Sequence, residues 1–222
     1  MTWISDAEDE AFVIENEWDV AIPVSFTVID GICEMHTYPS VEKAVRAVYE
    51  TYKDDLFSDA ALSALWDAVE PFFAENGYAH DRFRDRWGYV FRGTASSDAT
   101  ARLLTCEDED KNLTTYDIEM TLLDGRGAFG VEADGKIVSL AVTHAPTDCG
   151  VNILEVGVET AKDYRGRGYA QASLRALSAA LAEKGIMTEY RCQRYNTASY
   201  RVAKSAGLSL CGKYYYYVGR KE

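Results

Sequence analysis

The 222-residue sequence contains no apolar run that approaches the roughly 20 residues of a membrane-spanning helix. Its first ten residues, MTWISDAEDE, are acidic and lack the basic-then-apolar order of a secretory signal. We therefore expect a cytoplasmic protein with no membrane partner. Hydrophobic residues make up 47% of the chain, which is ample for a packed core.

Recognisable metal and disulfide patterns are also missing. The five cysteines are widely spaced and odd in number, so they form neither a Cys-x-x-Cys metal motif nor a disulfide framework. The three histidines are equally scattered. We expect free thiols and no metal ion.

Basic residues are few, 23 against 36 acidic ones, and the net charge is −13. This charge repels nucleic acid, so no nucleic-acid partner is expected. An acidic surface often serves only to keep a protein dissolved. It would also attract an amine substrate, because free amines are protonated near neutral pH.

One stretch, Val151 to Leu181, contains an apolar strand, a turn rich in glycine and arginine, and a helix. In the turn RGRGYA, at positions 165–170, two glycines let the backbone approach a ligand closely where the helix begins. The N–H groups of a helix start and the positive end of its dipole suit a phosphate or pyrophosphate. The turn therefore predicts an anion-binding site.

Residue spacing separates three kinds of phosphate-binding loop. A nucleoside-triphosphate P-loop needs Gly-Lys-Ser/Thr, but Gly168 is followed by Tyr-Ala-Gln. A dinucleotide loop needs Gly or Ala three residues after its second glycine, where this chain has Gln171. What remains is Arg-x-x-Gly-x-Ala, at Arg165, Gly168 and Ala170, after a strand that ends at Thr160.

This motif resembles the acetyl-coenzyme A signature of the general-control-related N-acetyltransferase (GNAT) superfamily. Two other segments are similar to family patterns in the right order. One is an Asn-x-Ala-Ser segment at Asn196, followed by a helix that closes at Gly207. The other is a hairpin of strands at 126–132 and 136–144. From about Ala101 onward, the resemblance implies a GNAT-type acyltransferase fold, α/β with a mixed sheet.

The resemblance also implies an activity: transfer of an acetyl group from acetyl-CoA to a primary amine, by direct attack in a ternary complex. The acceptor would be a small-molecule amine or a peptide amine. Backbone groups of Val158, Glu159 and Thr160 would pair with the pantetheine arm and polarise the thioester carbonyl. The other expected coenzyme A contacts are Arg165, Gly166, Arg167, Gly168, Tyr169, Ala170 and Asn196.

Glu155 is the expected catalytic carboxylate, since it lies near the position where the family often carries a base. The alternative is an exposed charge on a strand. Acetyl transfer also needs a proton for the departing thiolate. Many relatives supply it from a tyrosine seven residues after the asparagine, but here that position is Ala203.

Among nearby hydroxyls, we expect Tyr200 to be the acid, because it lies one helical turn after the asparagine. The alternative is that Tyr200 packs against the sheet. Tyr195, Ser199 or no dedicated acid are further possibilities, since a thiolate is a good leaving group. Without the usual tyrosine, the chain could also be a non-catalytic sensor of acyl-CoA.

The first hundred residues resemble no family motif. Apolar, β-branched runs at 12–14 and 20–32 predict short strands. Helical spacing predicts helices from Ser40 to Tyr52 and from Asp59 until Pro71, with an Asn-Gly stop after it. The charged aromatic segment at 80–87 is interpreted as a solvated helix turn.

Residues 93–100, GTASSDAT, are small and polar and predict a linker. We therefore expect a mixed α/β extension over residues 1–97, which covers the acceptor side, and an acetyltransferase domain over residues 98–222. The acidic segment 107–111 is expected to form a turn, and helical turns are expected over 112–123.

Overall fold

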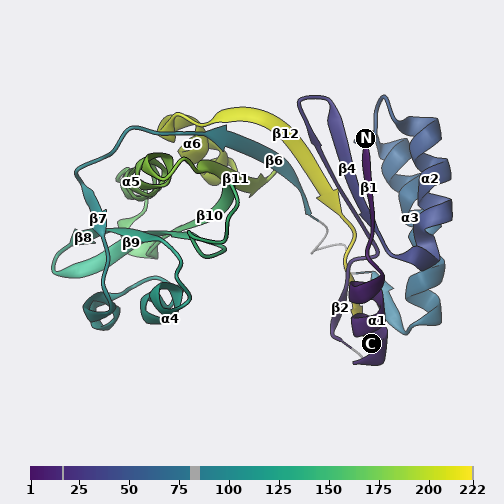
Figure 1. Ribbon diagram of the computed structural model, residues 1–222, viewed down its shortest axis with the longest axis horizontal. Helices are drawn as coiled ribbons and strands as arrows, with labels where there is room; N and C mark the ends of the chain where they lie inside the picture. Colours follow the sequence, from purple (N-terminus) through teal and green to yellow (C-terminus); the bar gives the residue numbers. More distant parts are fainter. Residues whose placement is uncertain (17, 81–85, 222) are drawn as a thin grey trace. The chain divides into compact units, whose positions relative to one another are not determined.

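The computed structural model describes residues 1–16, 18–80 and 86–221 (Figure 1). The chain packs into two compact units, one of Met1–Gly88 with Gly212–Glu222 and one of Tyr89–Cys211. Strands β6 (Arg86–Gly93) and β12 (Ser209–Tyr216) have residues in both. The domain boundary expected between residues 97 and 98 stays a prediction.

The first unit contains a sheet with the strand order β1, β4, β3, β12. β1 runs parallel to β4, and the other neighbours are antiparallel. A second sheet has the order β2, β13, β5. The bounds are β1 (Thr2–Ser5), β2 (Val20–Ala21), β3 (Val24–Ile29), β4 (Ile32–Thr37), β5 (Tyr78–His80) and β13 (Gly219–Lys221).

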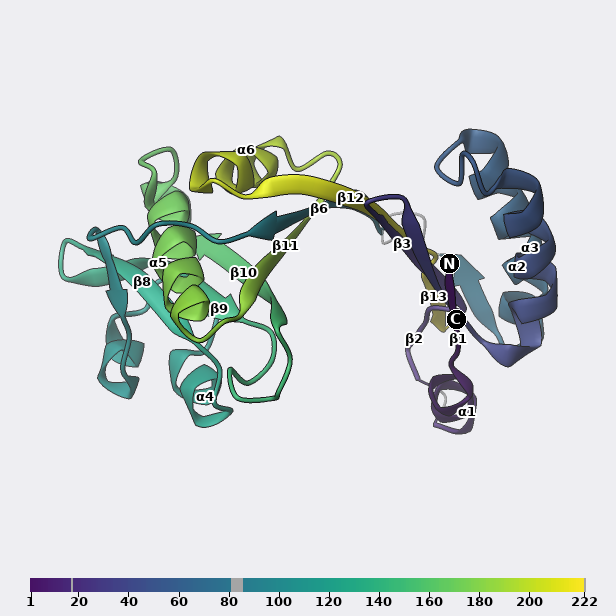
Figure 2. The ribbon, with the colours of Figure 1, turned by 45° about the horizontal axis from the view of Figure 1, so that its top comes forward.

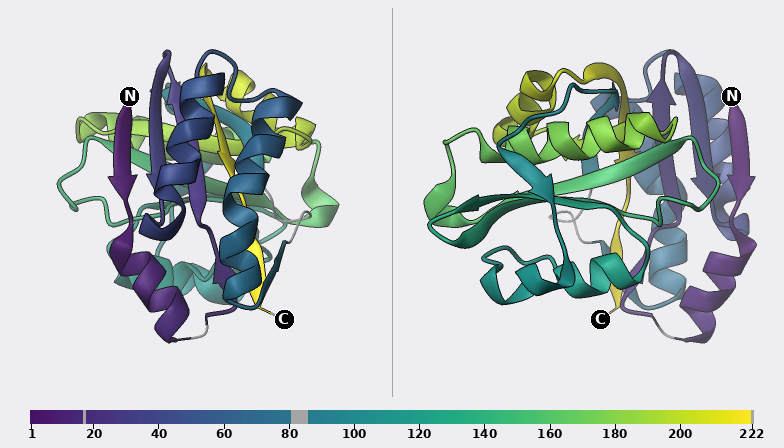
Figure 3. Two further views of the ribbon diagram at one scale, coloured as in Figure 1. Left: turned by 90° about the vertical axis from the view of Figure 1, so that its right-hand side faces the viewer. Right: turned by 60° about the vertical axis from the view of Figure 1, so that its left-hand side comes forward.

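Helices α2 (Pro39–Tyr52) and α3 (Asp59–Glu75) lie side by side in this unit (Figure 3). Their apolar stripes supply buried side chains such as Val45 and Leu65 to a core shared with Phe26 of β3 and Met35 of β4. The predicted end of the first helix at Tyr52 is confirmed. Ser58 caps the second, as its hydroxyl accepts a hydrogen bond from the backbone N–H of Ala61.

Two predictions in this unit are wrong. The run at 12–14 is not a strand but part of helix α1 (Ala7–Glu15), whose first turn carries three acidic residues that favour a helix start. Pro71 does not end α3, which continues to Glu75 and then stops at the Asn-Gly pair. Phe72 and Phe73 are buried beyond the proline, and their burial offsets the missing backbone hydrogen bond.

The charged segment at 80–87 falls largely outside the described residues. His80 ends β5, and Arg86 and Trp87 begin β6. The rest of β6 runs through residues 88–92 to Gly93.

The second unit contains a mixed sheet with the strand order β12, β6, β11, β10, β9, β8, β7. β7 to β10 form antiparallel pairs, whereas β10 and β11 are parallel. The expected hairpin is confirmed, with Asp134 and Gly135 at its turn. The fold class, α/β with a mixed sheet, is also confirmed. The bounds are β7 (Ala101–Leu103), β8 (Ala128–Ala133), β9 (Lys136–Thr143), β10 (Ile153–Thr160) and β11 (Met187–Gln193).

Helix α5 (Tyr169–Glu183) packs on β8, β9 and β10, and α6 (Thr197–Ala206) packs beside it (Figure 2). The short helices η1 (Cys106–Lys111) and α4 (Ile118–Leu123) lie on the opposite face of this sheet (Figure 1). Only the second half of the expected 112–123 helix is therefore helical. Among the described residues, no helix combines the length and apolar composition needed to cross a bilayer.

An ion pair between the exposed Arg102 of β7 and a buried carboxylate holds η1 to the sheet. Asp108, whose side chain is 5% exposed, accepts hydrogen bonds from both terminal nitrogens of Arg102, at 2.9 and 2.7 Å. It also accepts one from the backbone N–H of Thr105 at 2.9 Å, completing a capping box. The Arg102 guanidinium holds the pKa of Asp108 well below its usual range, although burial opposes this.

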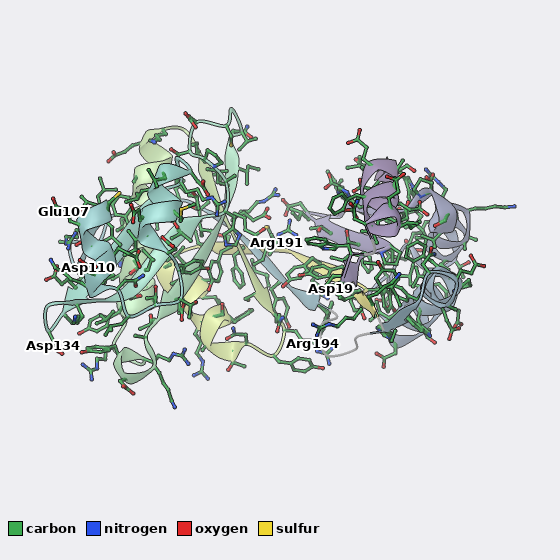
Figure 4. The ribbon with its side chains drawn as sticks, turned by 90° about the horizontal axis from the view of Figure 1, so that it is seen from below. Asp19, Glu107, Asp110, Asp134, Arg191 and Arg194 are labelled. Carbon is green, nitrogen blue, oxygen red and sulfur yellow. The ribbon has the colours of Figure 1, made fainter. Side chains whose placement is uncertain are left out.

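Asp108→Ala is expected to lower the free energy of unfolding by about 2 kcal/mol, because it removes a cap and a charge-assisted pair. Since the folded pKa is depressed, this contribution is fully present above about pH 4, the range of an unfolded aspartate, and is lost as pH falls through the folded pKa. Urea unfolding at pH 7 and pH 3 measures both effects. Asp110→Ala is the matched control, since Asp110 is exposed on the same short helix (Figure 4). Equal destabilisation by both changes would contradict the prediction.

Candidate active site

The central feature of the second unit is the separation of β10 from β11. The two strands pair over Ile153–Glu155 and Met187–Glu189, and the following residues of β10 pair only with β9 on its other side. A hollow of about 510 Å³ opens beside Val158, Glu159 and Thr160. Its size is typical of a small-ligand or cofactor site.

The turn predicted to bind an anion forms one end of this hollow. Gly166 and Gly168 have left-handed φ angles of 78° and 83°, and α5 begins directly after them. Only glycine adopts such angles without strain, so both side-chain-free positions are required by the turn. Gly166, Gly168, Tyr169 and Ala170 all line the hollow. The first N–H groups of α5 have no partner within the helix and are available to an anionic group.

The two arginines of the turn have different surroundings. Arg165 lines the hollow, and its Nε donates to the backbone oxygen of Thr160 at 3.0 Å. Arg167 donates to the backbone oxygen of Asp163, and its guanidinium carbon lies 5.1 Å from the ring centre of Tyr164. Arg165 thus fastens the turn to the end of β10, whereas Arg167 is not among the lining residues.

A line of hydroxyl groups supports the floor of the hollow. The Ser139 hydroxyl lies 2.9 Å from that of Thr160 and 3.2 Å from that of Ser173, and all three residues are buried. It also donates to the backbone oxygen of Glu159 at 3.1 Å. These bonds join β9, β10 and α5 and fix the strand on which the predicted backbone contacts lie.

The opposite wall is formed by the start of α6. Asn196 lines the hollow and caps the helix, as its Oδ1 accepts from the backbone N–H of Ser199 at 3.0 Å. Ser199 also lines the hollow, and its hydroxyl lies 2.5 Å from that of Tyr190 on β11, another lining residue. Burial raises the pKa of Tyr190, so this phenol keeps its proton at neutral pH.

Tyr200 does not line the hollow. Its ring packs edge-on against Tyr89 and Phe91, each with centroids 5.1 Å away. The position of the family's usual tyrosine, Ala203, is fully buried. Tyr190 is therefore a hydroxyl that sequence spacing missed, because it comes from a different strand and not from the helix after Asn196.

Beyond the hollow, toward the start of β10, lies a cluster of ionisable side chains around Glu155. One carboxylate oxygen is 3.6 Å from Nδ1 of His144, and the other is 3.5 Å from Nε of Arg191. Burial raises the pKa of Glu155, but the neighbouring His144 ring and the Arg191 charge outweigh burial and leave the pKa below its usual value. Glu155 is thus held as a carboxylate.

Glu159 shares a strand face with Glu155 and Gly157, since alternate residues of β10 point to the same side. Its Oε2 accepts hydrogen bonds from the backbone N–H and the hydroxyl of Thr115, at 2.9 and 2.6 Å. Between the two glutamates, a Cβ at Gly157 would lie 2.7 Å from Nε2 of His144 and closer still to the Tyr116 hydroxyl. The sequence alone did not predict that His144 and Tyr116 lie at this strand face. The glycine between two glutamates was a signal that other side chains approach the strand there.

The described residues contain no group of three or more His, Cys, Asp or Glu side chains that could hold a metal ion. The five cysteines are free, two of them buried.

Several solved structures are similar to this chain. A GNAT-family protein from Novosphingobium aromaticivorans is 22% identical, with a TM-score of 0.52, covering 66% of this chain and 69% of its own. A GCN5-related N-acetyltransferase-like protein from Streptococcus suis is 20% identical, with a TM-score of 0.48 and coverages of 69% and 68%. An acetyltransferase of the GNAT family from Colwellia psychrerythraea is 13% identical, with a TM-score of 0.48 and coverages of 90% and 81%.

No curated protein sequence matches the chain. The family model described as GNAT acetyltransferase matches residues 104–217, which is more than half of the 222 residues. The match spans the turn at 165–170, the separating strands and the start of α6. The protein therefore belongs to the GNAT acetyltransferase family.

Proposed function

We propose that the protein is an acetyl-CoA-dependent N-acetyltransferase that transfers the acetyl group to a primary amine by direct attack in a ternary complex. The observation that carries the proposal is one hollow that joins the turn at 165–170 to the separated part of β10. A pyrophosphate at the helix start would direct the pantetheine arm along Val158, Glu159 and Thr160. The thioester would then lie toward Glu155, since each strand residue advances about 3.3 Å.

This arrangement suits the chemistry of acetyl transfer. The backbone of β10 provides groups that can pair with the pantetheine arm and polarise the thioester carbonyl. Glu155 supplies a carboxylate near the place where the amine would lose its proton. The acidic composition favours a cationic acceptor. We infer a small-molecule or peptide amine as acceptor, no nucleic-acid or membrane partner, a cytoplasmic location, and an acceptor-side role for residues 1–97.

Isothermal calorimetry with coenzyme A and a thiol-release assay with a panel of amines test the proposal. Binding of coenzyme A together with amine-dependent thiol release supports the proposal that the protein is an enzyme. Binding without turnover of any amine would favour the alternative, a non-catalytic acyl-CoA sensor, for which the buried Ala203 at the usual acid position is the supporting observation. Absence of binding would contradict both.

The proton for the departing thiolate has two candidate donors. The sequence predicts Tyr200 as the donor. The location of Tyr190 on the wall of the hollow favours Tyr190 instead, with Ser199 as its hydrogen-bond partner. Tyr190→Phe is expected to lower kcat about tenfold, while Tyr200→Phe, the matched change, leaves kcat nearly unchanged. Steady-state kinetics at saturating acetyl-CoA decide between them. A lower kcat only in Tyr200→Phe would support Tyr200 as the acid. An unchanged kcat in both variants would mean that solvent protonates the sulfur.

A further inference from the structure

The side chain of His144 is placed between the predicted catalytic carboxylate and the open face of β10. His144 follows β9, and its backbone N–H donates to the backbone oxygen of Glu155 at 2.9 Å. Its ring nitrogen Nδ1 faces the Glu155 carboxylate at 3.6 Å. The backbone and side-chain contacts together fix the position of the imidazole beside the point where β10 and β11 separate.

The second ring nitrogen has a different environment. Nε2 points to the space above Gly157, where a Cβ would lie only 2.7 Å from it. Among the described residues, no group is hydrogen-bonded to Nε2, and the His144 side chain is 46% exposed. When Nδ1 carries the proton toward the carboxylate, Nε2 has its lone pair directed to the open side.

The surroundings of Glu155 make it a poor direct base. His144 and Arg191 stabilise its charged form, and a carboxylate stabilised in this way takes up a proton less readily. Arg191 also donates to the buried Glu189 at 2.7 Å, so it is held in place by a second carboxylate. A carboxylate that is held ionised beside an imidazole is the arrangement that orients a histidine for proton transfer.

We propose that Nε2 of His144 accepts the proton of the acceptor amine, and that Glu155 is a positioning residue that acts through Nδ1 of His144. This inference rests on the proposed function and names the base of that same reaction. The groups that face His144 are Glu155 from β10 and Tyr116 from the segment before α4, and Arg191 of β11 acts through Glu155.

The amine nitrogen attacks the thioester carbonyl carbon, the carbon–sulfur bond breaks, and the electron pair of that bond leaves with sulfur. The proton lost by nitrogen goes to Nε2, and the sulfur takes one from a hydroxyl on the wall of the hollow or from solvent. The imidazolium then returns its proton to solvent. Tyr116, whose pKa is raised by burial and by the charges of Glu159 and Glu155, stays protonated and can donate a hydrogen bond to the same space.

The test compares His144→Gln with Glu155→Gln in the full chain. His144→Gln is expected to lower kcat about a hundredfold and to remove the acidic limb of its pH profile, with calorimetric coenzyme A affinity unchanged. Glu155→Gln is expected to lower kcat about tenfold and to keep an acidic limb, because the imidazole is still present but loses the carboxylate that orients it. His144→Ala should regain turnover when imidazole is added, which a structural role would not allow.

A matched control exists on β4, where Nε2 of His36 lies 3.2 Å from Oε1 of Glu34. His36→Gln is expected to behave as wild type, and thermal unfolding checks that each variant folds. Loss of turnover in Glu155→Gln with a wild-type kcat and pH profile in His144→Gln would overturn the proposal, because Glu155 would then be the direct base.

Failure of the proposed function is a separate outcome, recognised by wild-type protein that binds no coenzyme A or turns over no amine. The pairing is tested in that case by NMR of the ring nitrogens of neutral His144, which shows which nitrogen carries the proton. A fall in the Nδ1-protonated form in Glu155→Gln supports the pair, and an unchanged ratio of the two forms overturns it.

Discussion

Gly168→Asp is expected to weaken coenzyme A binding roughly a hundredfold, because it places a carboxylate at the helix start that should receive the pyrophosphate. The backbone of Gly168 is left-handed, with φ of 83°, and no atom lies within 4 Å of an added Cβ. The new side chain therefore fits sterically. Its carboxylate would accept hydrogen bonds from the N–H groups at the start of α5 and would repel a bound anion. Isothermal calorimetry measures the change directly.

The control for this variant is Gly185→Asp, at the other end of α5. Gly185 is also left-handed, with φ of 74°, is exposed, and has no atom within 4 Å of an added Cβ. Both substitutions carry a similar backbone cost for a residue with positive φ. A matching loss of affinity in both proteins would show that strain, and not the anion site, is responsible. Unchanged affinity in Gly168→Asp would place the coenzyme elsewhere.

Gly157→Ala is expected to lower kcat by about a hundredfold, since a displacement of about 1 Å among reacting groups has effects of this size. The added methyl group would overlap the Tyr116 hydroxyl and approach Nε2 of His144. Both side chains would have to leave their places beside Glu155. Coenzyme A affinity should stay near wild type, because Gly157 is not among the residues that line the hollow.

Gly127→Ala, directly before β8 of the same sheet, provides the comparison. The three atoms nearest to its added Cβ would be methyl groups of Leu177, Thr147 and Thr143, at 3.0 to 3.6 Å. Some loss of stability is expected from overpacking, without loss of kcat in the folded protein. Steady-state kinetics below the unfolding midpoint of each variant separates the two effects. Wild-type kcat in Gly157→Ala would mean that neither Tyr116 nor His144 has to keep its position.

The sequence by itself determined the elements that depend on local signals. The turn at 165–170 needs glycine at two left-handed positions, and a helix start follows directly, so the turn could be predicted from residue order. The hairpin around Asp134 and the Asn196 cap are local in the same way. The family resemblance rested on these segments, and the matched range of residues 104–217 contains them all.

Other features were decided only by the tertiary structure. Helix α3 passes Pro71 because aromatic side chains beyond it are buried, and a burial gain of this kind cannot be seen in a local window. The placement of Tyr190 on the wall of the hollow depends on how β11 diverges from β10.

The pairing of His144 with Glu155 was hidden for the same reason. The two residues are eleven positions apart on neighbouring strands, and their side chains meet because β9 and β10 pair antiparallel through Thr143 and Val156. The connection between β9 and β10 is too long to be a two-residue turn that fixes the strand register, so the packing of the sheet faces sets that register. The sequence therefore determined where a coenzyme could bind, and the strand register determined which side chains stand beside the predicted reaction site.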